Sequence, residues 1–434
     1  MNQKTAYSPS FGTSTLNKKR QPATEVASGA SVNSGSDAGA ARIVGSDGGA
    51  GRIVGSDGGA GRIVGLDAGA GRIVGSDAGA GRIVGGADSR AGRIVGRGWP
   101  GVPQVWLVGT LAVTLAAFAA AVALAPPASA PPVRGLAWLL FVGSSVHVAS
   151  TGWLYTLPEV RGHARQHPAK LVLLPAALIL ATAVLAAALS PATMAWFLLP
   201  YYAWQFFHFQ KQNLGMAALA ASSRRAAPLR PAERRALMTA GYAGIAGLIA
   251  HPGLLQLRLD PGLGFMYPIA AMVFVGAVAV GVITVARRPG GGAAFRAVYL
   301  SSLCFFGPVF VFGSPYAAVG GMTIAHGLQY LLLIGLVAAG NRQLPGRAIR
   351  LAVACNIALI GGLALSAASH LHGAAFAGRL AFGAYLGVVM AHFVIDASLW
   401  RLRDPFPRAF VASRVPGLLP ARISVPDGSP ADLR

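Results

Sequence analysis

Four histidines carry most of the chemistry that this sequence can support. His147, His208, His326 and His392 each lie inside an apolar stretch of the chain. An ionisable group in hydrocarbon is costly unless it is paired or lines a water-filled space. Neutral imidazole is also the commonest protein ligand for iron, zinc and copper. The four residues therefore predict a shared site that holds either one metal ion or a pair of haems.

Each histidine is followed four residues later by a side chain that can form hydrogen bonds. These followers are Thr151, Gln212, Tyr330 and Asp396. Positions i and i+4 share one face of a helix, and a ligating histidine usually donates its second N–H to such an acceptor. We therefore expect Thr151, Gln212 and the nearby Gln329 to help hold the cofactor. A histidine that only hydrogen-bonds within the core is the competing interpretation.

Asp396 is the only acidic residue that we place within a membrane span. A lone carboxylate in a low-dielectric interior is unfavourable unless it is paired or protonated. Lys211 lies three residues after His208 and either neutralises Asp396 or extends to the membrane interface. We predict catalytic roles for Asp396, Lys211 and Tyr330.

The elements that must position these residues are transmembrane helices. The chain is 54% hydrophobic and only 12% charged, whereas soluble proteins are about a quarter charged. Because a helix needs about 20 residues to cross a bilayer, the sequence predicts an all-α bundle of about ten spans. We place them at 104–125, 135–156, 171–190, 194–216, 236–255, 266–286, 297–313, 319–339, 350–369 and 380–400.

Basic residues alternate between the predicted loops. Lys and Arg favour the cytoplasmic side of a membrane. With the N-terminus inside, the predicted outer loops hold only Arg134, Arg258 and Arg379, and the inner loops are rich in arginine. This pattern predicts a protein of the bacterial inner membrane with both termini cytoplasmic, and all four histidines then lie on helices that run inward. The net charge of +22 reflects these loops and does not indicate a nucleic-acid partner, because no single module concentrates it.

The first hundred residues have a different composition. A decapeptide close to GSDxGAGRIV recurs over about residues 35–96. Such Gly-rich repeats contain too little apolar surface to offset the entropy of ordering, so we predict a disordered cytoplasmic tail over 1–100. A transmembrane domain over 101–405 and a cytoplasmic C-terminal tail over 406–434 would follow.

Three runs in the chain resemble runs in polytopic bacterial membrane proteins of unassigned function. They are HFQKQNLG at 208–215, HGLQYL at 326–331 and HFVIDASLWR at 392–401. His392 with Asp396 is also similar to the HxxxD elements of the Brp/Blh-type carotenoid oxygenases, although no PHG-type element lies beside it here. That resemblance implies non-haem iron held by histidines inside the membrane.

Three functions fit these features. The first is a membrane oxidoreductase or oxygenase that binds iron through the four histidines and acts on a lipophilic substrate from the bilayer. The second is an electron-transfer protein with two bis-histidine haems. The third is a proton-coupled transporter that uses His392, Asp396 and Lys211 as a relay, although the sequence offers no second buried carboxylate.

Overall fold

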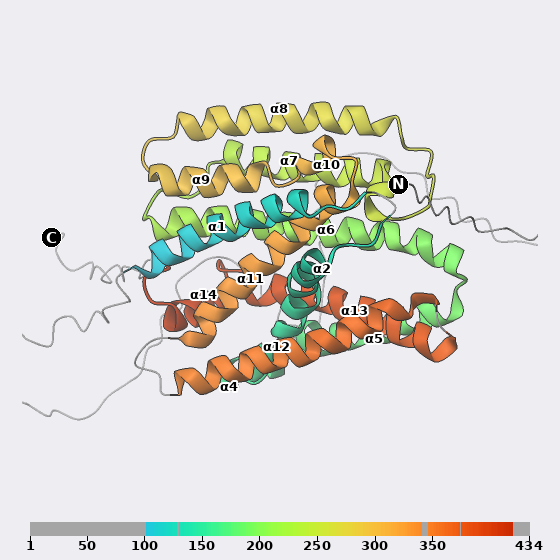
Figure 1. Cartoon of the computed structure of the whole chain (residues 1–434). Coiled ribbons are helices and arrows are strands. Elements are labelled where there is room, and N and C mark those ends of the chain that lie inside the picture. The colour runs from blue at the N-terminus through green and yellow to red at the C-terminus, as the bar shows by residue number, and fades with distance from the viewer. Residues whose placement is uncertain (1–100, 128–129, 341–345, 374, 420–434) are drawn as a thin grey trace, which may run out of the picture. The chain divides into compact units, whose positions relative to one another are not determined.

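The computed structural model describes residues 101–127, 130–340, 346–373 and 375–419. The predicted repeat tail at 1–100 and residues 420–434 lie outside this part of the chain. Every element of regular secondary structure within it is helical, as the sequence predicts. The arrangement can be followed in Figure 1.

Seven helical segments of the described chain are long and apolar enough to cross a membrane. They are α1 (Val102–Ala123), α2–η1–α3 (Arg134–Leu154), η2–α5 (Ala169–Ala188), α8 (Met266–Ala286), η4–α11 (Tyr316–Ala339), α12–η5 (Arg347–Gly373) and α13 (Phe376–Leu399). They coincide with seven of the predicted spans. Their number and apolarity indicate a multi-pass membrane protein.

The other three predicted spans differ in character. Helix α6 (Pro191–Ser223) is 33 residues long, but its polar residues lower its apolarity, and α7 (Pro231–Ala250) begins with Glu233, Arg234 and Arg235. The segment 297–313 is not one helix, because α9 (Gly292–Leu303) ends before α10 (Pro308–Val311) begins. Pro308 has no N–H to donate and so interrupts the helical hydrogen bonding.

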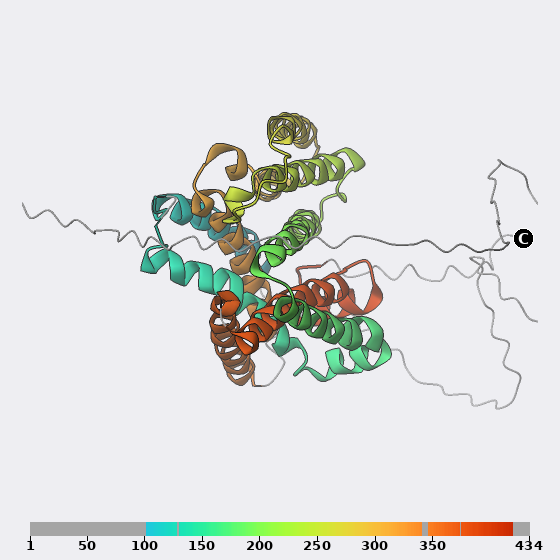
Figure 2. The ribbon, with the colours of Figure 1, turned by 90° about the vertical axis from the view of Figure 1, so that its right-hand side faces the viewer.

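Most of the long helices run roughly parallel to one another, whereas α11 crosses them obliquely (Figures 1 and 2). Helix α11 contacts α1, η1 and α12, and α13 lies along α5. Short elements occupy the connections: α4 (Pro158–Gln166), η3 (Pro252–Leu255) and α14 (Pro405–Arg414). Helix α11 thus links otherwise separate parts of the bundle.

The predicted domain boundary at residue 405 is wrong for the described part of the chain. Helix α14 begins at Pro405, and its Phe410 and Val411 are buried. The Arg414 guanidinium also donates a hydrogen bond of 2.6 Å to Glu159 on α4. Residues 405–419 therefore belong to the helical bundle and not to a tail, because their apolar side chains complete its core.

Two glycines permit a very close helix crossing. A Cβ atom added to Gly327 on α11 would lie 2.2 Å from the backbone oxygen of Gly143 in η1. Small residues allow membrane helices to approach in this way. The crossing lies one residue from His326 and close in sequence to His147, so it sets the relative positions of those two histidines.

Gly327→Ala is expected to destabilise the protein by about 1–3 kcal/mol, the usual cost of overpacking a close-packed core. Thermal unfolding of the purified protein measures this loss. Gly335→Ala on the same helix is the matched control, because an added Cβ there meets nothing within 4 Å. Equal melting temperatures for the two variants would contradict the crossing.

Removal of residues 1–98 is expected to leave membrane insertion intact. The first membrane-length helix begins at Val102, so every apolar segment on which insertion depends is retained. Membrane fractionation of the truncated protein checks this expectation. Loss of the protein from the membrane fraction would show that residues 1–98 are needed for insertion or folding.

Candidate metal centre

The four predicted histidines come from four different helical segments. His147 starts α3 (His147–Leu154) directly after the π-helical turn η1 (Val142–Val146). His326 lies on α11 (Gly321–Ala339), which follows a second π-helical turn, η4 (Tyr316–Gly320). His208 lies within α6 and His392 within α13. Such π-turns occur frequently at functional sites, and neither was predicted from the sequence.

The structure brings the four imidazole rings together in a closed group. The ring of His147 lies 5.0 Å from that of His326 and 5.1 Å from that of His392, centre to centre. The His208 ring lies 5.1 Å from each of the same two rings. Each histidine therefore has two others as direct neighbours.

Six nitrogen atoms of this cluster are buried and have no hydrogen-bond partner among the described residues. They are both ring nitrogens of His147 and His326, and Nε2 of His208 and His392. Buried polar groups almost always have partners, so a group of six without any calls for an explanation. Two groups of three residues could each hold a metal ion, because one ligand atom from each residue lies within 4.8 Å of the other two. The first group is His147, His326 and His392, and the second is His208, His392 and Asp396.

A chain of hydrogen bonds fixes the tautomer of His392. The Tyr330 hydroxyl donates its single proton to Asp396 Oδ1 at 2.9 Å, and it lies 2.9 Å from Thr151 Oγ1. Tyr330 must therefore accept from Thr151. The Thr151 hydroxyl, having donated its own proton, must accept from His392 Nδ1 at 2.7 Å. His392 consequently keeps the lone pair on Nε2, the atom that faces the cluster.

Asp396 lies at the edge of the cluster. Its Oδ2 is 3.8 Å from His208 Nε2 and 3.6 Å from His392 Nε2. Its Oδ1 also accepts a hydrogen bond of 3.1 Å from the Trp400 indole. Trp400 was not predicted as a site residue, although its position four residues after Asp396 was the available signal.

Gln212 and Gln329 lie one layer further from the rings. The Gln212 amide donates to the backbone oxygen of His326 and to Gln329 Oε1, both at 3.0 Å. Gln329 in turn donates to Thr114 Oγ1 at 2.7 Å. These two residues therefore support the α11 backbone and do not contact the rings through hydrogen bonds. Thr114 was not predicted, because α1 carries no histidine.

Lys211, which was expected either to pair with Asp396 or to extend to the membrane interface, is not part of this cluster and does not contact Asp396. Its side chain is exposed, and its ammonium lies 5.8 Å from the centre of the Phe207 ring. Residues four apart share a face of a helix, so Lys211 follows Phe207 along the outside of α6. The partners of Asp396 are Tyr330, Trp400 and two histidines instead.

Two phenylalanines stack on the histidine rings. Phe209 is parallel to His326 with 3.9 Å between ring centres, and Phe393 is stacked on His208 at 4.6 Å. Each phenylalanine directly follows a clustered histidine in the sequence but covers a histidine of another helix. The repeated His-Phe pair was the signal in the sequence that could have indicated this stacking.

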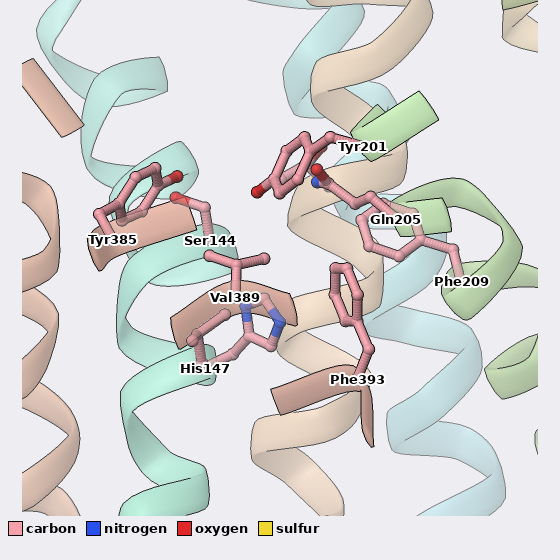
Figure 3. Close-up of a pocket in the computed structure, with 10 residues that line it drawn as sticks. Ser144, His147, Tyr201, Gln205, Phe209, Tyr385, Val389 and Phe393 are labelled. Carbon is pink, nitrogen blue, oxygen red and sulfur yellow. The ribbon is translucent and has the colours of Figure 1, made fainter. Parts of the chain in front are cut away.

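A small cavity lies against the cluster. Its volume is about 20 Å³, which is room for about one water-sized molecule, and His147, Phe209 and Phe393 form its inner wall. Figure 3 shows Tyr201, Gln205, Ser144 and Tyr385 on the other side. A molecule in this space would contact His147 directly.

The remaining histidines lie elsewhere. His163 stacks on Phe406 at 3.9 Å and lies 4.5 Å from the His167 ring. Partial burial and the neighbouring His167 lower the pKa of His163. His370 and His372 lie in η5, beyond the end of α12. None of them joins the four-histidine cluster.

Comparison with protein-family models, curated proteins and solved structures finds no match to this chain. A functional assignment must therefore come from the site itself.

Proposed function

We propose that this protein binds one metal ion, iron, through His147, His208, His326 and His392 and oxidises a lipophilic substrate from the bilayer. The observation that supports this proposal most directly is the group of six buried imidazole nitrogens without partners. A metal ion at their centre would satisfy one lone pair from each ring. No other polar group of the described chain does so.

The surroundings fit a resident metal. Ligating histidines usually hydrogen-bond through their second nitrogen to an oriented acceptor, as His392 does with Thr151. His392 offers one free nitrogen, which favours a single ion over two ions that share this residue. Bound iron would supply the redox chemistry, and Asp396 would accept a hydrogen bond or carry a proton beside the rings.

The spacing of the rings argues against two haems. All four neighbouring pairs of rings are separated by 5.0 or 5.1 Å. In a bis-histidine haem the plane of the porphyrin lies between the two imidazole rings, and four rings that are direct neighbours leave no room for two such planes, so two haems would require the helices to separate. The transporter hypothesis requires a proton relay through His392, Asp396 and Lys211, and it is weakened because Lys211 lies outside the cluster.

Metal analysis and an optical spectrum of the purified protein test the proposal together. We expect about one iron per chain and no Soret band. A Soret band would support the haem alternative, and protein that binds neither iron nor another transition metal would refute the metal centre.

The membrane orientation is also part of the proposal. In Figure 1, α4, α14 and the α6–α7 and α8–α9 connections lie at the same end of the bundle. The α6–α7 and α8–α9 connections carry Arg224, Arg225, Arg287 and Arg288. The bias of basic residues toward the inside favours a cytoplasmic location for this end, in a bacterial inner membrane.

Reporter fusions test this orientation. Fusions at residues 225 and 345 are expected to report a cytoplasmic location, and a fusion at 258 an external one, because the basic loops face inward. The 258 fusion serves as the internal control for reporter activity. A reversed result at any of the three positions would contradict the proposed topology.

A further inference from the structure

We propose that a second, larger cavity binds a single-chain amphiphile whose anionic head pairs with Arg379 and whose apolar chain points toward the histidine cluster. This inference rests on the proposed function and names the class of its substrate. The cavity is called the chamber below and is defined by Met194, Leu198, Leu254, Arg379, Phe382 and Leu386, among other residues.

The chamber is large and mainly apolar. Its volume is about 590 Å³, and its walls come from α6, η3, η4 and α13. Ligand pockets in proteins usually measure about 300–1,000 Å³, so the chamber has room for one long hydrocarbon chain. Each methylene group that is buried adds to the affinity, which favours an extended hydrocarbon.

The chamber adjoins the small cavity beside the histidines. Tyr201, Gln205, Thr323 and Tyr385 line both spaces. Figure 3 shows Tyr201, Gln205 and Tyr385 on the side of the small cavity away from His147. A chain in the chamber that contacts these residues therefore ends beside the cavity that borders His147.

Arg379 supplies the charge for the head group. It is half-buried at the chamber wall, and its Nε donates a hydrogen bond of 3.0 Å to the backbone oxygen of Ala186. That bond orients the guanidinium, and no carboxylate of the described chain forms an ion pair with it. None of the residues that line the chamber is acidic. An unpaired guanidinium binds carboxylate or phosphate through two parallel hydrogen bonds.

Binding of spin-labelled stearic acid and its methyl ester to the purified full-length protein tests the inference. The two probes share their chain and differ only in the charge of the head. We expect the acid to bind about tenfold more tightly than the ester. Arg379→Gln should abolish this preference, and Arg379→Lys should retain part of it. Arg134→Gln, at an exposed arginine outside the chamber, is the charge-matched control.

A second pair of variants tests the chamber itself. Ala195 lines the chamber, so Ala195→Trp should reduce binding of both probes, whereas Ala192→Trp on the exposed side of α6 should not. Equal binding of acid and ester to the wild type would refute the anionic head. Unchanged binding in Ala195→Trp would refute the chamber.

Metal content measured on the same samples separates this inference from the proposed function. Stearate binding by protein that holds neither iron nor another transition metal would refute the metal centre and keep the chamber. Full iron content without selective stearate binding would refute the anionic-head site in the chamber and leave the metal centre in place.

Discussion

Replacement of any one of the four clustered histidines by alanine is expected to reduce bound iron at least about tenfold. These histidines are His147, His208, His326 and His392. Each ring would contribute one ligand to the same ion, and a loss of only 1.4 kcal/mol in binding free energy already lowers affinity tenfold. Metal analysis after purification in identical buffer measures the effect.

Matched controls separate ligation from general damage. His163 and His370 lie in connecting helices away from the cluster, so His163→Ala and His370→Ala should retain iron. The elution volume and helical content of each variant show whether it is folded. If all six variants bind the same amount of metal, the four-histidine centre does not exist.

The second large effect is expected for Asp396→Asn. The new amide oxygen can still accept hydrogen bonds from Tyr330 and Trp400, so expression and folding should be preserved. The amide NH₂ group would replace the Oδ2 atom that lies 3.6 Å from His392 Nε2. We expect metal affinity or turnover to fall about ten- to a hundredfold, the usual range when an outer partner of a metal ligand is lost.

The control for this prediction is Asp404→Asn. The Asp404 side chain is 46% exposed and forms ion pairs with Arg401 and Arg403, so the loss of its charge should leave metal binding unchanged. A competitive chelator titration measures the affinity of each variant. Wild-type affinity in Asp396→Asn, together with greater thermal stability in Asp396→Leu, would show that the carboxylate is incidental.

The positions of most membrane helices could be predicted from the sequence, because the bilayer imposes a local requirement. About 20 predominantly apolar residues satisfy it, and α1, η2–α5, α8, α12–η5 and α13 each supply such a stretch. The segment 297–313 was predicted as one span, but in the structure α9 ends at Leu303 and α10 begins at Pro308. Apolar residues continue across Gly307-Pro308, so composition alone does not reveal that the helix stops.

The histidine cluster was partly predictable for the same reason. Helical periodicity places His392 and Asp396 on one face, and the cost of polar groups in hydrocarbon indicates that such faces turn inward. Periodicity also left two positions open for Lys211, because a residue three positions from His208 can lie on either side of the buried face. The rotation of α6 about its axis decides between them.

Only the tertiary structure decided which side chains meet. Thr151 was expected to support His147 on its own helix, yet it bonds to His392 and Tyr330 on two other helices. These partners depend on the crossing at Gly143 and Gly327, where two backbones approach too closely for any Cβ. The sequence by itself thus determined which helices carry the clustered histidines and their polar neighbours. Their partners, and the chamber beside them, were decided by packing between segments far apart in the chain, because such contacts follow from the shapes of both surfaces and have no local period.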